Sequence, residues 1–263
     1  MLSRHAPLAA ALLLLMQAPP ALADGSFDIA VGGIVVVAPE YEGAKDYKVM
    51  GAPIAFPIGA SFGADGMVQF RGIDDLRLRL LNASGFEAGP LVGWRFDREE
   101  DDGDRLLGLG DVDGGLVVGG YAGYRFGAFM PFVSYHHQVT GDDTGGVLRF
   151  GAEAKTTLAY GITATVTGGA TYADDEYMDA YFSVSGAQSA RSVAGLGVYD
   201  AEAGIKDVFI GFSGDVPIDD RWSVKVSGRY AHIIGDAADS AIVEQESQFS
   251  GGLGLTYRFS VGR

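Results

Sequence analysis

The sequence predicts an all-β chain that folds as an antiparallel transmembrane β-barrel of about 12 strands. Three observations predict it: segments with strict two-residue alternation, connections that sort into short and long, and a composition rich in turn-forming and aromatic residues. The chain of 263 residues has 40 Gly, 15 Phe, 12 Tyr and no Cys. Glycine-rich turns and girdles of aromatic residues are typical of such barrels. Without cysteine, disulfides and thiolate metal sites are excluded.

The first 23 residues have the pattern of a cleaved secretory signal. Arg4 supplies a positive start, Leu8–Met16 is an apolar core, and Ala21–Ala23 is a small-x-small cleavage site. The mature chain, 24–263, is then one barrel domain, exported to the outer membrane of a Gram-negative cell. No later stretch reaches 18 uninterrupted apolar residues. Any crossing of a membrane must therefore use strands closed into a barrel.

The last segment, Gln248–Phe259, carries the clearest strand signal. Leu253, Leu255, Tyr257 and Phe259 fall on one face of an extended chain, and small or polar residues fall on the other. In an outer-membrane barrel the apolar face of each strand contacts lipid. The ending also resembles the closing-strand signal of bacterial outer-membrane barrels, although four further residues follow the final aromatic.

Similar alternation predicts eleven earlier strands, and the short pair within residues 66–81 has the weakest pattern. These strands are Asp24–Val37, Lys48–Phe56, Gly66–Gly72, Asp74–Leu81, Gly85–Phe96, Gly114–Arg125, Phe129–Val139, Gly146–Leu158, Ile162–Tyr172, Glu202–Val216 and Trp222–Ile234. The total of about 12 falls to 10 if the register over residues 48–81 differs. An even number places both termini in the periplasm.

The connections between strands alternate in length. The long ones are Asp97–Asp113, Ala173–Ala201 and Gly235–Ser247, and the short ones are Asn82–Ser84, Phe126–Ala128, Ala159–Gly161 and Pro217–Asp220. Long external loops and short periplasmic turns are the arrangement of outer-membrane barrels. A secreted β-sandwich has no reason to sort its connections in this way.

The polar faces of the predicted strands carry charged side chains that should line the lumen. They are Arg77, Arg79, Glu87, Arg95, Arg125, Arg149, Glu153, Lys155, Lys225, Arg229 and Arg258. Nine are basic and two are acidic, which favours anions if the lumen is open. The alternative is a filled interior in which the arginines pair with Glu87, Glu153 and loop carboxylates. Twelve strands lie between small packed barrels and wide pores, so both interpretations stand.

Few residues suggest chemistry. Ser134 and His136 share the lumenal face of one strand, the spacing of a Ser-His pair, but no third orienting group is evident, so lumen lining is favoured. The acidic run from Asp97 to Asp104 lacks the spacing of a calcium loop, and we predict that it is a solvated external loop. We therefore predict no catalytic, cofactor-binding or metal site, and no enzyme activity. The net charge of −15, or −16 after loss of Arg4, argues against nucleic acid.

Several strings, in order, resemble the MipA/OmpV family of outer-membrane proteins. They are PEYEG from Pro39, GFEAGPLVGWRF from Gly85, YAGYRFGAFMPFVSY from Tyr121, DDEYMDAYFSV from Asp174, YDAEAGIKDV from Tyr199, IGDAADSAIVE from Ile234 and the closing GLTYRF. The likeness covers essentially the whole mature chain. One departure is Ala241 after Ser240, where family members commonly have proline.

The resemblance implies an outer-membrane barrel without catalytic residues. It also implies a scaffold that joins a murein-cleaving lytic transglycosylase to a murein-synthesising penicillin-binding protein, with a narrow basic channel as the alternative. Membrane lipid, lipopolysaccharide and, during insertion, the barrel assembly machinery are further expected partners. Because the matching strings fall largely in predicted external loops, we expect those loops to plug the lumen. Tyr177, Tyr181, Phe182 and Asp236 should then be buried.

Overall fold

The computed structural model describes residues 27–58 and 67–261. The predicted signal peptide, residues 1–23, lies outside them. The strands are β1 (Phe27–Pro39), β2 (Tyr47–Ile58), β3 (Val68–Gly72), β4 (Asp75–Leu78), β5 (Leu81–Ala83), β6 (Phe86–Arg95), β7 (Gly115–Tyr124), β8 (Phe129–Gln138), β9 (Gly146–Thr157), β10 (Thr163–Ala173), β11 (Gly204–Pro217), β12 (Trp222–Ile233) and β13 (Ser247–Val261). The all-β prediction of about 12 strands is confirmed.

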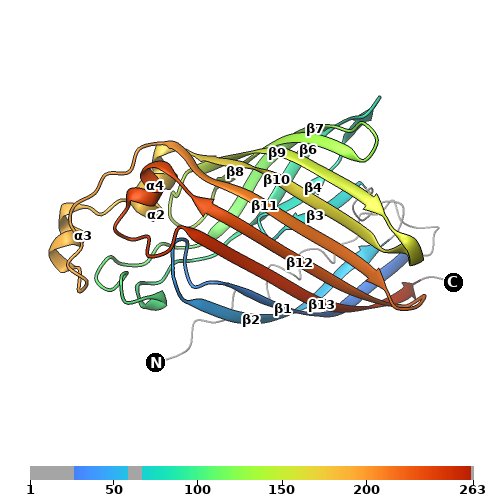
Figure 1. Cartoon of the computed structure of the whole chain (residues 1–263), viewed down its shortest axis with the longest axis horizontal. Helices are drawn as coiled ribbons and strands as arrows, with labels where there is room; N and C mark the ends of the chain where they lie inside the picture. Colours follow the sequence, from blue (N-terminus) through green and yellow to red (C-terminus); the bar gives the residue numbers. More distant parts are fainter. Residues whose placement is uncertain (1–26, 59–66, 262–263) are drawn as a thin grey trace.

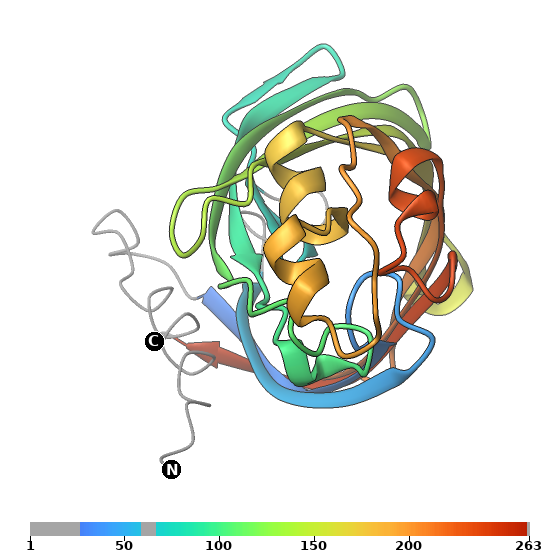
Figure 2. The ribbon, with the colours of Figure 1, turned by 90° about the vertical axis from the view of Figure 1, so that its left-hand side faces the viewer.

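One antiparallel sheet contains all of these strands and curls into a barrel, with its strands tilted across the long axis (Figures 1 and 2). Its order is β2-β1-β13-β12-β11-β10-β9-β8-β7-β6-β4-β3, and β5 also pairs with β6. The closing strand β13 therefore joins the first strand β1, with Phe27 opposite Val261. Among the described residues, β2 and β3 are the two ends of this order.

The alternation of side chains sets the two faces of the wall. On β1, Val31, Val35 and Val37 are exposed on the outside, whereas Ala30 is buried. On β13, Leu253 is exposed and small or polar residues face inward. Because successive residues of a strand point to opposite faces, the outside is an apolar surface that suits lipid and the inside is polar.

The wall has an irregularity between β4 and β5. Arg77 pairs with Leu91 on β6, but Leu81 pairs with Ala88, so β6 has one residue fewer over this interval. The extra residue makes a β-bulge, which places two consecutive leucines, Leu80 and Leu81, on the outside. The predicted single strand Asp74–Leu81 is divided at this point.

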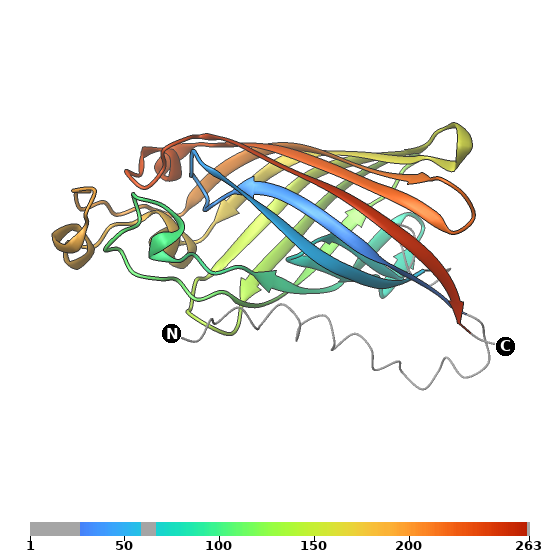
Figure 3. The same cartoon turned by 90° about the horizontal axis from the view of Figure 1, so that it is seen from below.

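The connections divide by end of the barrel. At the short-turn end, tight connections such as the one at Ser84–Gly85 join the strands (Figures 1 and 3). Phe27 and Val261, the first and last residues that the structure describes, pair with each other. At the long-loop end, the connections include the helices α2 (Asp175–Phe182), α3 (Gly186–Arg191) and α4 (Gly235–Asp239), which lie across the opening (Figures 1 and 2). We call these segments the cap. Among the described residues, no helix has the length and hydrophobicity needed to cross a bilayer.

The helices within the long connections were not predicted, and their causes are local. Asp174 caps α2 because its side chain accepts a hydrogen bond from the backbone N–H of Tyr177. The buried residues Tyr177, Met178, Tyr181 and Phe182 recur at helical spacing on one face. In α3, Ser185 and Gln188 form a reciprocal capping box. These helices are short, so their stability comes mainly from packing against the barrel.

Candidate functional site

The lumen near the short-turn end holds a cluster of two carboxylates and three arginines. Arg125 donates from Nε to Glu87 at 3.0 Å and from Nη2 to Glu153 at 3.1 Å. Arg71 on β3 donates to the same Glu153 oxygen at 3.0 Å, and Arg79 lies 3.6 Å from Glu87. Both carboxylates are almost fully buried. The arginines therefore neutralise acids that β6 and β9 present from separate parts of the wall.

A second cluster lies at the tip of the β3–β4 hairpin. Arg77 makes a bidentate pair with Asp75, with both N–O distances at 2.7 Å. The guanidinium of Arg77 also lies over the ring of Tyr121, 4.7 Å from its centroid. Arg149 on β9 donates to Asp74. The bidentate pair fixes Arg77 within β4, and its stacking on Tyr121 of β7, together with the pair between Asp74 and Arg149, attaches the hairpin tip to other strands.

Ser134 and His136 belong to this second cluster. His136 Nδ1 lies 3.0 Å from the backbone carbonyl of Asp74, which can only accept a hydrogen bond, so Nδ1 carries the proton. Nε2 is then free to accept from the Ser134 hydroxyl, 3.0 Å away. Both side chains are completely buried. The pair therefore holds the hairpin tip from the lumenal side, and neither side chain meets bulk water.

A third cluster lies beneath the cap. Lys206 on β11 pairs with Glu42 and, at 2.7 Å, with Asp207. Asp207 also accepts from Thr171 at 3.0 Å and from Arg229 at 3.3 Å. Lys206 and Asp207 are adjacent yet both buried, because the register of β10 and β11 shifts at this point. The bulge turns two charged side chains to the same side.

The cap is joined to this third cluster through Tyr177. Its hydroxyl donates to Glu42 at 2.8 Å, and the guanidinium of Arg95 lies 4.8 Å from its ring centroid. The ring of Tyr181 packs against it with centroids 4.6 Å apart. Burial and the carboxylate of Glu42 raise the pKa of Tyr177 above its usual value. Its hydroxyl therefore stays protonated and remains a donor at neutral pH.

The cap has its own apolar core. Tyr177, Tyr181 and Phe182 are buried against Ile233 and Ala237. Further residues form a second apolar cluster where four connections meet; it contains Tyr41, Ala44, Leu106, Leu109, Val184, Leu196 and Ile242. Asp236, the remaining plug candidate, is half-buried and accepts a hydrogen bond from the backbone N–H of Glu202 at 3.1 Å.

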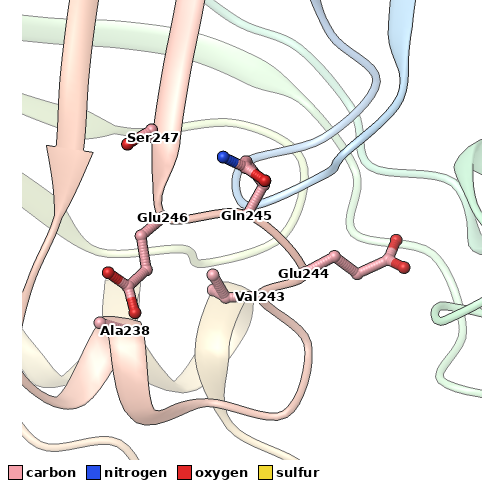
Figure 4. Close-up of a pocket in the computed structure, with 6 residues that line it drawn as sticks. All are labelled: Ala238, Val243, Glu244, Gln245, Glu246 and Ser247. Carbon is pink, nitrogen blue, oxygen red and sulfur yellow. The ribbon is translucent and has the colours of Figure 1, made fainter.

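Glu244 joins its own connection, 234–246, to the connections at 40–46 and 96–114. It accepts from Tyr41 at 3.1 Å and from Lys45 at 2.7 Å, and Arg105 lies 3.8 Å away. Burial raises the pKa of Glu244, but the hydrogen bonds from Lys45 and Tyr41 outweigh burial and lower it overall. A hollow of about 300 Å³ lies between α4 and β13. Figure 4 shows Glu244 and Glu246 pointing apart there, so they do not face a shared ligand.

The other predicted lumen residues lie at several heights. Arg95 donates to the hydroxyl of Thr144 at 2.8 Å, Lys225 pairs with Asp215, and Arg258 pairs with Asp28 near the chain termini. Lys155 is half-buried on β9. Within the described part of the chain, no group of three His, Cys, Asp or Glu residues is arranged to hold a metal ion.

Sequence reasoning missed several acids that complete the clusters. Asp74 and Asp75 fell in a strand with a weak pattern, Glu42 in a loop string, and Asp207 at a bulge. A strict two-residue alternation cannot identify an inward side chain at a bulge or a hairpin tip. The available signal was the surplus of predicted inward arginines, which required buried acids as partners.

Acidic residues also dominate the long-loop end. The connections at 40–46, 96–114, 139–145, 174–203 and 234–246 hold 3, 8, 2, 6 and 4 acids, which is 23 of the 34 in the chain. They hold only 4 of its 19 Lys and Arg residues. The excess negative charge of the protein therefore lies on the cap, while the lumen has paired charges.

An apolar outer wall, a polar interior, and long and short connections at opposite ends define an outer-membrane β-barrel with a capped lumen. The family model described as "MltA-interacting protein MipA" matches residues 31–259. The chain therefore belongs to the MipA family, and the resemblance predicted from its sequence strings is confirmed. No curated protein matches the chain in sequence.

Solved barrels match with low scores. OprB of Pseudomonas putida is 8% identical, with 91% of this chain and 96% of that chain covered and a TM-score of 0.43. The transport unit of the autotransporter AIDA-I from Escherichia coli is 11% identical, with 96% and 97% covered and a TM-score of 0.41. The channel DcaP of Acinetobacter baumannii is 8% identical, with 89% and 96% covered and a TM-score of 0.38. Such scores carry no information about function.

Proposed function

We propose that this barrel is a non-catalytic anchor that holds a murein-cleaving lytic transglycosylase, and with it a penicillin-binding protein, at the periplasmic face of the outer membrane. The observation that carries the proposal is the family match over residues 31–259, whose description names an interaction with MltA. Anchoring requires a stable barrel and a periplasmic surface, and it requires neither an open pore nor a catalytic group.

The filled lumen supports an anchor over a pore. Arg125 and Arg149 pair with carboxylates from strands that are not their neighbours in the sheet, and Arg229 pairs with Asp207 on the adjacent strand. The cap then covers the long-loop end with a packed apolar core. A solute would have to separate several buried ion pairs and displace the cap, and breaking one buried pair costs about 3–5 kcal/mol.

The alternative is a narrow channel with a basic lumen, favoured by the number of inward arginines. The charge of the cap opposes anion entry, because 23 acids surround the opening at the long-loop end. A channel of this kind should conduct in planar bilayers with an anion preference that falls in Arg149→Ala or Arg229→Ala.

The anchor is tested by recovering the tagged barrel from detergent-solubilised envelope. We expect a lytic transglycosylase or a penicillin-binding protein to remain bound through a high-salt wash. A barrel of similar size from another family, carrying the same tag, controls for non-specific retention. Recovery of the barrel alone, together with steady conductance in bilayers, would replace the anchor with the channel.

A further inference from the structure

The turn between β9 and β10 has an unusual residue at its tip. Tyr160 has φ 62° and ψ 21°, and Gly161 follows with φ 74°. The backbone N–H of Ile162 bonds to the carbonyl of Ala159 at 3.4 Å. Positive φ at both central residues is the geometry of a type I′ turn, which favours Asn, Asp or Gly at the first position. A tyrosine there is strained, because its Cβ crowds the backbone in the left-handed region.

A second turn at the same end of the barrel provides a comparison. Ser84 and Gly85 have φ 52° and 88° and join β5 to β6. Here a short polar residue occupies the strained position. The fold of the β9–β10 turn therefore does not require tyrosine, and a small residue would make it more easily.

The side chain of Tyr160 is displayed to solvent. It is 92% exposed, and Ile218 in the next turn and Leu158 before it are 61% and 53% exposed. The two turns are adjacent, because the ring of Pro217 lies beside Gly161. We call Leu158, Tyr160 and Ile218 the periplasmic knob, since short turns of outer-membrane barrels face the periplasm. Asp220 is also exposed, in the turn between β11 and β12 that contains Ile218.

We propose that the periplasmic knob is the contact through which the barrel holds the murein-cleaving enzyme, an inference that rests on the proposed function. Tyrosine is a frequent anchor of protein interfaces because its rigid ring fills an apolar pocket and its hydroxyl forms a hydrogen bond. The partner surface should offer such a pocket, a polar group for the hydroxyl and a basic residue for Asp220. Strain accepted at an exposed tip is typical of a functional position.

The competing occupant of the knob is lipid, because tyrosine also collects at membrane interfaces. Measuring binding in detergent micelles removes the bilayer and separates the two. The test compares Tyr160→Asn, which suits the type I′ turn, with Ser84→Asn, which introduces the same residue at the equivalent position of the comparison turn. Ile218→Ser serves as a second knob variant without backbone strain.

We expect Tyr160→Asn and Ile218→Ser each to lower retention of the transglycosylase by tenfold or more, while Ser84→Asn retains it as wild type does. Thermal unfolding of Tyr160→Asn should occur at the same or a higher temperature, which excludes misfolding as the cause. Equal retention by wild type and both knob variants overturns this inference alone. If the wild-type barrel retains no enzyme, the proposed function fails and the inference fails with it.

Discussion

Arg149 on β9 donates to Asp74 at the tip of the β3–β4 hairpin, with 2.5 Å between Nη2 and Oδ2. Strands β6, β7 and β8 separate the two in sheet order, so their contact crosses the lumen rather than following the wall. His136 holds the backbone of the same hairpin tip from β8. An element of the barrel wall thus also occupies its interior.

This crossing predicts that the wild-type barrel does not conduct steadily in planar bilayers. The ion pair spans the interior between strands that are not neighbours, and the cap lies across one end of the barrel. Single-channel recording measures this directly, with a general porin inserted in the same membranes as the positive control. A steady, anion-selective current that falls in Arg149→Ala would contradict the closed lumen.

Glu153 should be important for stability. Its side chain is only 3% exposed and accepts from both Arg71 and Arg125. In Glu153→Gln the two guanidinium groups lose their shared charge partner, and we expect a loss of about 3 kcal/mol in the free energy of unfolding. Urea unfolding in detergent measures it. Asp215→Asn is the control, because Asp215 is 40% exposed and its pair with Lys225 should contribute less than about 1 kcal/mol.

Tyr177→Phe should loosen the cap without unfolding the barrel. The change removes the hydroxyl that donates to Glu42 but keeps the ring between Arg95 and Tyr181. A hydrogen bond to a charged group contributes about 1.5–3 kcal/mol, so amides of α2 should exchange at least tenfold faster. Hydrogen exchange resolved by peptide measures the rate. Tyr172→Phe, on the lipid-facing side of β10, should leave α2 unchanged.

The cap should also loosen in acid through Glu244. Its folded-state pKa lies below the unfolded value, so its carboxylate stabilises the cap fully above about pH 4.3. This contribution is lost as the pH falls through the lowered folded-state pKa. The amide hydrogen-exchange rates of residues 40–46 and 240–246, after correction for the intrinsic pH dependence of exchange, should increase over that acidic range. Glu244→Gln should show weaker protection at pH 7 and a smaller change with pH; an unchanged pH response would contradict the assignment.

The wall of the barrel could be predicted from sequence because each strand has a lipid face and a lumen face. Leu253 and Leu255 on β13 are exposed and alternate with Gly252, Gly254 and Thr256, and that pattern predicts both the strand and its orientation. The lengths of the connections then indicate which end of the barrel is external and which is periplasmic. These are local signals, and neither depends on which strand pairs with which.

The interior could be predicted only in part. Arg125 and Glu153 follow the alternation, and the structure places them in one cluster. Asp207 is buried next to Lys206 because of a bulge, and Asp74 reaches Arg149 from a hairpin tip, where the alternation of a strand does not apply. The cap helices depend on packing: α2 is short and forms because its apolar face is buried over the opening. Such tertiary causes leave little trace in local sequence.

The most direct test of the anchor is equilibrium binding between the purified barrel in detergent and a purified lytic transglycosylase from the same cells. We expect saturable binding at micromolar or lower concentration, which Tyr177→Phe leaves unchanged although it loosens the cap, and which Tyr160→Asn weakens. The proposal that this protein anchors a murein enzyme would be contradicted by the absence of binding at tens of micromolar. An unfolding measurement on the same sample must show that the barrel is folded.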